Sequence, residues 1–379
     1  MPEDDARRAA TALSASVDEL LTAALDRGDT GLETGRFIVT FREGAVDAGI
    51  QALTATGMQV ADAREFTGQA VGQAGVSGAG GLVFPEIGAA LLSGAAAQEQ
   101  GMSVASSTAA DSPFATVEPE YFAFTEQVTA EFARSAAAAG TDPASEYLRG
   151  FVQAADVIAR DLYGGRQRQV ATDGQEALVL GATWGLGACR VPQSAQSGVG
   201  VTVAVLDTGV DPGHPDLTNR NIEGETFVGQ PVQDLHSHGT HCIGTACGPQ
   251  APPGTIPRYG IAYRSAIFAG KVLSNSGSGS TGGILNGINW AIANRCQVIS
   301  MSLGSQSPVQ AAYTAAGRAA LDAGLLIVAA AGNSAQPTGS PANSPTIMSV
   351  ASVDPDLAPS AFSNFGKIDI SGPGRPPTA

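Results

Sequence analysis

Short runs of apolar residues, each followed by a polar side chain, recur in the second half of the chain. Residues 201–206 and residues 325–331 are β-branched or apolar throughout. Such runs predict strands that are buried on both faces of a parallel sheet. Asp207 and Asn333 follow these two runs. Because ligands and catalytic groups gather beyond the carboxyl ends of strands in open α/β sheets, we expect both side chains to lie at a functional edge.

The first 34 residues show a different pattern, in which apolar positions recur at helical spacing among charged residues. This spacing predicts a leader helix that either docks on the rest of the protein or stays flexible. The apolar positions are Leu13, Val17, Leu20, Leu21 and Leu25.

Residues 35–124 alternate between strand and helix patterns, which predicts a small α+β domain in a repeated β-α-β order. The predicted elements are strand 36–42, helix 48–56, strand 58–66, strand 81–84, helix 86–93 and strand 114–120. Residues 125–180 are alanine-rich and amphipathic as far as residue 163, with a break at residues 140–143. They predict a helical linker or insert to which the sequence assigns no role.

Composition narrows the class of protein. The chain has 379 residues, of which 43% are hydrophobic and 15% charged, and this is typical of a globular protein with two or three domains. A net charge of −15 disfavours nucleic acid and gives no support to an anionic membrane as partner. No apolar run is long enough to span a membrane, and the N-terminus lacks the apolar core of a secretory signal. We expect a soluble monomer, and the sequence leaves its location open.

The four cysteines have neither zinc-pair spacing nor the spacing of a disulfide framework. They are Cys189, Cys242, Cys247 and Cys296. The sequence predicts free, buried thiols, although a disulfide between Cys189 and Cys296 remains open.

A histidine motif lies between the two predicted buried strands. His238 is followed by small and apolar residues as far as Cys247, which suit a helix packed closely beneath it. A buried carboxylate such as Asp207 can hold a neutral imidazole in one tautomer, so that the ring takes a proton from a hydroxyl. The amide of Asn333 can donate a hydrogen bond to an oxyanion. These three residue types together supply most of the chemistry of acyl transfer.

Two other interpretations of these residues remain open. The segment Asp207-Thr-Gly also fits one half-site of an aspartic protease, which needs a second carboxylate to share a proton. The chain's other Asp-Thr-Gly, at residues 29–31, follows charged residues and no apolar run, so that mechanism would require a dimer. His236, His238 and His241 are spaced closely enough to be zinc ligands.

In these motifs the chain resembles the subtilisin-like serine proteases, whose catalytic residues follow the order aspartate, histidine, serine. The resemblance implies an α/β fold with three layers around a parallel sheet. It also implies that Asp207 is the orienting acid, His238 the general base and Asn333 the oxyanion donor. Cys242, directly after the histidine motif, is similar to the proteinase K-like branch. The matching segments are residues 198–211, 214–217, 237–241, 271–273, 286–292, 300–304 and 362–366.

The resemblance further implies two substrate-binding edges that pair with an extended peptide or protein substrate as an added strand would. The edge residues are Gly277, Ser278, Gly279, Ser302, Leu303 and Gly304. No cofactor is required. The resemblance allows a structural calcium ion, but residues 248–257 do not match the family's calcium loop, so no metal ligand is assigned.

The chain departs from the family in one respect. In the family, the segment that resembles residues 368–374 is followed by Gly-Thr-Ser-Met-Ala, whose serine is the nucleophile. Here Arg-Pro-Pro-Thr-Ala follows, and Gly-Thr-Ser-Met-Ala occurs nowhere in the 379 residues. We therefore expect the precursor of an endopeptidase, truncated before its serine and inactive as given. A non-catalytic peptide-binding module and a fragment that cannot fold alone are the alternatives.

Residues 35–124 resemble the ferredoxin-like inhibitory propeptide of the same family, whose last strand ends in an acidic pair. Glu118 and Glu120 fit that pair. The resemblance implies a domain that templates folding and blocks the cleft as an intramolecular partner, while a structural domain of another purpose remains open. The expected organisation is a leader at 1–34, a propeptide-like domain at 35–124, a linker at 125–180 and an incomplete subtilisin-like domain at 181–379.

Overall fold

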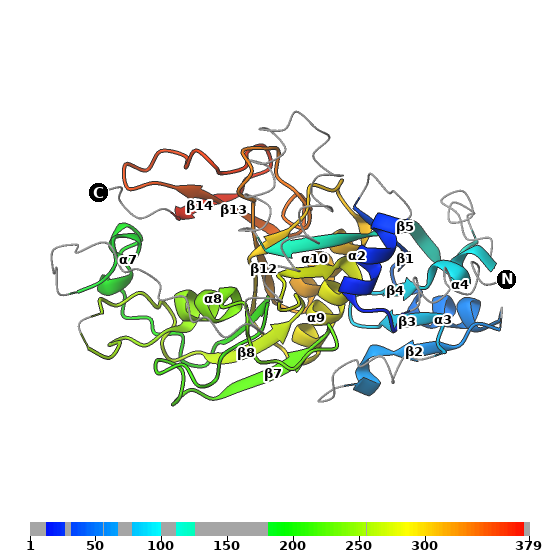
Figure 1. The fold of residues 1–379 in the computed structure, drawn as a ribbon, viewed down its shortest axis with the longest axis horizontal. Helices are drawn as coiled ribbons and strands as arrows, with labels where there is room; N and C mark the ends of the chain where they lie inside the picture. Colours follow the sequence, from blue (N-terminus) through cyan, green and yellow to red (C-terminus); the bar gives the residue numbers. More distant parts are fainter. Residues whose placement is uncertain are drawn as a thin grey trace.

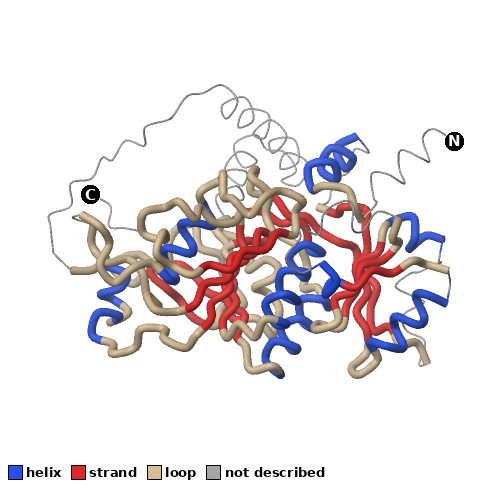
Figure 2. The backbone as a smooth tube through the Cα atoms, turned by 90° about the horizontal axis from the view of Figure 1, so that it is seen from below, coloured by secondary structure: helices blue, strands red, loops and turns tan. Residues whose placement is uncertain are grey.

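The computed structural model describes residues 13–26, 32–55, 57–66, 78–99, 111–125, 181–254 and 256–374. These residues form two β-sheets with helices packed between and beside them (Figures 1 and 2). The two helices predicted between residues 125 and 163 lie outside the described residues.

The sheet of the C-terminal half is parallel throughout, with the strand order β14-β13-β12-β10-β6-β8-β7. Both strands predicted from apolar runs are present. β6 lies near the middle of the sheet and is buried on both faces, whereas side chains along β12 alternate between buried and half-buried. The strands are β6 (Thr202–Asp207), β7 (Ile222–Thr226), β8 (Ala266–Lys271), β10 (Val298–Met301), β12 (Leu326–Ala330), β13 (Met348–Val353) and β14 (Ile370–Pro373).

Helices cover both faces of this sheet, and the alternation of side chains along β6 shows how. Val203 and Val205 pack with Ile243 of α8 (His238–Cys247) on one face. Ala204 and Leu206 pack on the other face in a cluster with α9 (Thr281–Ala293) and α10 (Ala311–Asp322). Because neighbouring strand residues point to opposite faces, one apolar run serves both helical layers. The predicted three-layer α/β fold is therefore confirmed. The short α7 (Trp184–Ala188) and η3 (Val191–Gln193) precede it.

The helices α9 and α10 lie between the parallel sheet and the N-terminal sheet (Figure 2). Its strands β5-β1-β4-β3 pair antiparallel in the order of a ferredoxin-like fold, and β2 adds a parallel edge. The elements are β1 (Glu33–Phe41), α3 (Val46–Ala55), β2 (Val60–Asp62), η1 (Ala63–Phe66), β3 (Gly81–Phe84), β4 (Ala89–Leu92), α4 (Gly94–Glu99) and β5 (Phe114–Thr125).

Two predicted elements of this sheet were wrong. The predicted helix 86–93 is instead the strand β4, which pairs with β1 and β3 and is buried on both faces. Without a solvent face its apolar run has no alternation, and the pairing with two neighbours overrides the helix propensity of alanine. The predicted strand 58–66 is shortened to β2, because η1 follows it directly.

The leader sequence forms the helix α2 (Val17–Asp26), which packs on the rest of the protein through its predicted apolar positions. A capping box opens the helix. The Ser16 backbone N–H donates to Glu19 Oε2 at 2.8 Å, and the Glu19 N–H donates to Ser16 Oγ at 3.3 Å. Among the described residues, no helix has the length and apolar character needed to cross a membrane.

Candidate active site

Four neighbouring strands of the parallel sheet end at one edge. Asp207, the last residue of β6, is level with Lys271, the last residue of β8. Met301, which ends β10, is level with Leu206 on one side and Ala329 on the other. This register brings Asp207, the residues after Met301 and the loop after β12 to the same edge of the sheet, as the sequence predicted for Asp207 and Asn333.

Asp207 and His238 form a buried pair at this edge. Asp207 Oδ1 lies 2.7 Å from His238 Nδ1, and the two side chains are 1% and 9% exposed. The same Oδ1 accepts the Thr208 backbone N–H at 2.7 Å, while Oδ2 is buried and has no hydrogen-bond partner among the described residues. A carboxylate at Nδ1 fixes the imidazole ring and assigns proton exchange with a substrate to Nε2.

Two glycines let the pair form. A Cβ on Gly239 would lie 2.3 Å from Gly209 O, and a Cβ on Gly209 would lie 2.1 Å from Val232 O. Gly209 also has a φ of +106°, which disfavours other residues. The first turn of α8 can therefore rest directly on the chain that leaves β6. This close approach explains why a glycine follows the aspartate segment and another follows His238.

Asp234, which no motif in the sequence indicated, organises the loop before His238. Its carboxylate accepts the Thr208 hydroxyl at 3.0 Å and the Thr240 hydroxyl at 2.6 Å. It also accepts the backbone N–H groups of His236, Ser237 and Thr240, each at 2.9 Å. Burial alone would raise the pKa of Asp234, but the hydrogen bonds from Thr240, His236 and Thr208 hold that pKa below its usual value. The only signal in the sequence was an acid four residues before His238.

Lys271 is a second residue whose role the sequence did not reveal. Its side chain is fully buried, and Nζ donates to Thr208 O and, at 2.8 Å, to Asn275 Oδ1. Burial lowers the pKa of Lys271 to about 8, against the opposing effect of the Asp234 and Asp207 charges. Through its hydrogen bond to Thr208 O, the ammonium group stabilises the turn after Asp207.

The three histidines considered as zinc ligands do not form a ligand cluster in the described part of the chain. The three-residue group that offers ligand atoms within 4.8 Å of one another is Asp207, His238 and Cys242. His236 lies edge-on to His238, with ring centroids 6.2 Å apart. Burial, followed by the neighbouring His238, lowers the pKa of His236. His241 is exposed.

All four cysteines are free thiols and the alternative disulfide is not formed, but the predicted burial is wrong for Cys189 and only partly met by Cys242. Cys189 is exposed, whereas Cys247 and Cys296 are buried. Burial raises the pKa of Cys296 to about 12, which leaves that thiol protonated and unreactive at neutral pH. Cys242 lies beside the site, with Sγ 3.8 Å from His238 Nδ1.

The two predicted substrate edges lie on either side of β5. On one side, β9 (Ser278–Ser280) pairs antiparallel with β5 and places Gly279 opposite Ala123. On the other side, β11 (Leu303–Gly304) pairs antiparallel with β5 and places Leu303 opposite Thr125. The Thr125 N–H also donates to Gly277 O at 2.9 Å, and Ser302 directly precedes β11. Five of the six predicted residues thus pair with or directly contact β5, and Ser302 adjoins them.

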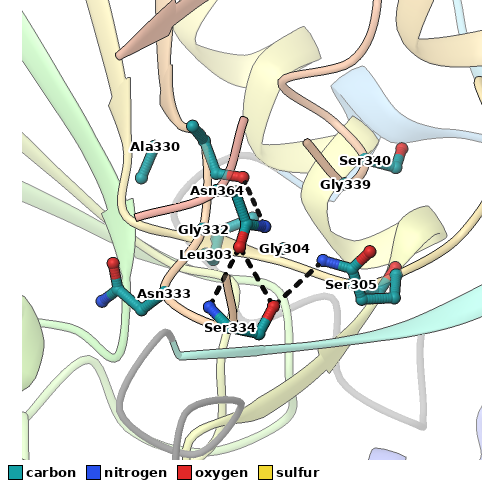
Figure 3. Close-up of a pocket in the computed structure, with 12 residues that line it drawn as sticks. Leu303, Gly304, Ser305, Ala330, Gly332, Asn333, Ser334, Gly339, Ser340 and Asn364 are labelled. Carbon is teal, nitrogen blue, oxygen red and sulfur yellow. Dashed lines mark hydrogen bonds between the residues drawn. The ribbon is translucent and has the colours of Figure 1, made fainter. Parts of the chain in front are cut away.

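Asn333 lies in the loop after β12 and lines a pocket together with Leu303 and Gly304 (Figure 3). Asn364 is hydrogen-bonded to the backbone on both sides of Asn333. Its Oδ1 accepts the Ser334 N–H at 3.0 Å, and its Nδ2 donates to Ala331 O at 3.0 Å. In Figure 3 the Asn333 side chain points away from Asn364. The sequence placed residues 362–366 among the matching segments but did not reveal this supporting role of Asn364.

The predicted acidic pair on β5 contacts the beginnings of two helices. Glu118 accepts the Ala311 and Ala312 N–H groups at 3.0 and 2.8 Å, at the start of α10. Burial raises the pKa of Glu118, partly offset by these two hydrogen bonds. Glu120 accepts the Gly282 N–H at 2.9 Å, at the start of α9. It also pairs with Arg36, whose Nη2 lies 2.9 Å from Glu120 Oε1. Carboxylates are favourable partners for the exposed N–H groups of helix N-termini.

The part of the chain that contains this site is similar to known proteins. Residues 198–378 match the subtilase family of peptidases. The chain is 40% identical over 187 residues to a subtilisin from Bacillus pumilus, which covers 47% of this chain and 66% of the relative. It is 38% identical over 187 residues to subtilisin E from Bacillus subtilis (strain 168), covering 47% of this chain and 48% of the relative.

A fungal relative and a solved structure extend the comparison. Subtilisin-like protease 1 from Trichophyton rubrum is 38% identical over 211 residues, which cover 51% of this chain and 40% of the relative. The crystal structure of a cold-adapted subtilisin-like serine proteinase is 34% identical, with a TM-score of 0.45, and the match covers 51% of this chain and 72% of that one. The chain spans about half to two thirds of the length of the bacterial subtilisins named above.

Proposed function

The chain belongs to the subtilase family through residues 198–378, and from this premise we propose that it is the precursor of a serine endopeptidase. The observation that carries the proposal is the buried hydrogen bond between Asp207 Oδ1 and His238 Nδ1 at the carboxyl edge of the parallel sheet. A buried carboxylate facing an imidazole suits proton transfer, whereas a cleft that only binds peptides has no physical need of it.

The proposed reaction is acyl transfer to a serine. His238 Nε2 takes the proton of the serine hydroxyl as its oxygen attacks the peptide carbonyl, and Asp207 stabilises the resulting imidazolium. Asn333 donates its amide to the oxyanion, a contact worth ~3–4 kcal/mol of transition-state stabilisation. His238 then returns the proton to the leaving amine, and a water molecule attacks the acyl-enzyme by the reverse route.

The proposed reaction needs a serine nucleophile. Gly-Thr-Ser-Met-Ala, the family's serine motif, is absent from the 379 residues. We therefore expect a polypeptide of these 379 residues alone to hydrolyse peptides at a negligible rate, because loss of the nucleophile costs roughly 10⁶ in kcat in a member of this family.

The N-terminal sheet is proposed to be an inhibitory propeptide. This is supported by β5, whose residues 122–125 run between the two edges and pair with both, as an extended substrate would. It is also supported by Glu118 and Glu120, which join β5 to α10 and α9. An occupied cleft of this kind excludes other peptides until the strand leaves.

Peptide hydrolysis by the product of the native gene tests this function. We expect hydrolysis when that product includes a serine in the family motif, and a loss of roughly 10⁶ in kcat when His238 is replaced by alanine. The control is His241→Ala, an exposed histidine on the same helix, which should leave the rate within a few-fold of the original. Undiminished hydrolysis by His238→Ala would contradict the proposed base. Tight peptide binding without any hydrolysis would favour the peptide-binding module instead.

A further inference from the structure

The two faces of the strand in the cleft belong to different apolar clusters. Ala123 belongs to the cluster that includes Leu273 and Leu303 of that domain. Phe122 and Phe124 point to the opposite side, where both are completely buried. There they pack with α2 in a separate apolar cluster, to which Leu32 also contributes. Residues far apart in the sequence therefore enclose β5 from both faces.

The contact between α2 and β5 is continuous and apolar. Leu20 and Leu21 are 0% and 1% exposed, and they pack with Phe122 and Phe124. Val17 and Ala24 extend the same buried side of the helix by one turn in each direction. The amphipathic pattern of the leader thus has a defined target, which is the outward face of the strand in the cleft.

Polar contacts align the helix with the cleft edge. The Ser276 hydroxyl, two residues before β9, lies 3.4 Å from Asp18 Oδ1 on α2. Ser276 Oγ also lies 2.9 Å from Ser278 Oγ, so the hydroxyl belongs to the edge that pairs with β5. Beyond α2, Leu32 O accepts the Phe122 N–H at 2.8 Å. The helix and the segment leading to β1 therefore contact both the strand and the rim of the cleft.

We propose that α2 is a clasp that holds β5 in the cleft, so that residues 13–26 set how long the cleft stays blocked. The inference rests on the proposed function, in which β5 is the inhibitory strand. Backbone pairing with β9 and β11 is open to any extended peptide that enters the cleft. The burial of Phe122 and Phe124 under α2 is available only to this chain's own strand, which gives it an advantage over substrates.

Amide hydrogen exchange of the 379-residue chain tests the clasp without requiring catalysis. In Leu20→Ala/Leu21→Ala, we expect the amides of residues 122–125 and of β9 to exchange at least tenfold faster, while those of β6 keep their protection. Thr22→Ala, on the exposed side of the same helix, is the matched control and should leave the exchange of β5 unchanged. If the double variant loses protection in β6 as well, Leu21→Ala alone supplies the same comparison with a smaller disturbance.

Unchanged protection of β5 in both leucine variants, with α2 itself exchanging freely, would overturn the clasp. A second readout separates the clasp from the proposed function. In a gene product that includes the family's serine motif, the double variant should release peptidase activity about tenfold sooner than Thr22→Ala. Absence of all peptidase activity there would contradict the proposed function, while the exchange result would still decide the clasp.

Discussion

At the carboxyl edge of the parallel sheet, some residues of the candidate site could be predicted from the sequence and others could not. Asp207 and His238 could be predicted because each stands in a local motif with the glycine that its geometry requires. Asp234 and Lys271 could not, because their roles depend on groups brought from other segments. The Asp234 carboxylate takes hydrogen bonds from both the β6 turn and the first turn of α8, and Lys271 reaches the Thr208 carbonyl from a different strand.

Replacing Asp234 by alanine should destabilise the protein and remove part of its pH dependence. The partly buried N–H groups of His236, Ser237 and Thr240 would lose their acceptor, at a cost of ~1–3 kcal/mol in the free energy of unfolding. The pKa of Asp234 is lowered in the folded protein. Its ionisation therefore stabilises the fold above the unfolded pKa of about 3.9, and this stabilisation is lost as the pH falls through the lower, folded pKa.

Urea unfolding at pH 7 and at several values below pH 4 measures both effects. The difference in the free energy of unfolding between the original protein and Asp234→Ala should shrink as the pH falls. Asp356→Ala removes an exposed aspartate and serves as the control, with a change close to zero at every pH. A difference that grows towards acid would contradict the assignment of Asp234 as a stabilising carboxylate.

At the scale of elements, periodicity predicted several strands and helices, whereas the strands formed by pairing alone were expected only as substrate-binding edges, from the resemblance to the family. β6 and β12 were recognisable from long apolar runs, and α2 from its helical spacing. β9 and β11 have only three and two residues, and they are strands because β5 pairs with them. β4 was mistaken for a helix because a strand buried on both faces carries no alternation.

The contact between β5 and α10 gives a prediction at this scale. Glu118→Ala should weaken the docking of β5, because the carboxylate accepts two N–H groups at the start of α10. Hydrogen bonds to a charged group contribute about 1.5–3 kcal/mol, and partial exposure of Glu118 favours the lower end. Urea unfolding followed by tryptophan fluorescence is a suitable measurement, since Trp290 is a buried residue of α9.

The matched control is Glu43→Ala, an exposed glutamate of the same sheet's domain, which should change the free energy of unfolding by a few tenths of a kcal/mol at most. An equal loss in the two variants, or none in Glu118→Ala, would contradict the view that Glu118 joins β5 to α10.

At the scale of the whole molecule, β5 connects the two halves of the chain. It pairs with β1 in the N-terminal sheet and with β9 and β11 at the edges of the cleft, so one strand belongs to both parts. α9 and α10 lie between the two sheets and contribute to one continuous core with both (Figure 2). The sequence indicated an α/β fold, a propeptide-like sheet and a leader helix. It did not reveal that the helix would cover the strand, because that contact joins residues about one hundred positions apart.

In the proposed function, Asp207 and His238 serve a serine which these 379 residues do not carry in the family motif. Labelling with a fluorophosphonate, followed by mass mapping of the modified residue, tests it most directly. We expect no label on the 379-residue polypeptide, and in a longer product of the native gene a single label on the serine of Gly-Thr-Ser-Met-Ala, lost on His238→Ala. A stoichiometric label on any serine within residues 1–379 would contradict it.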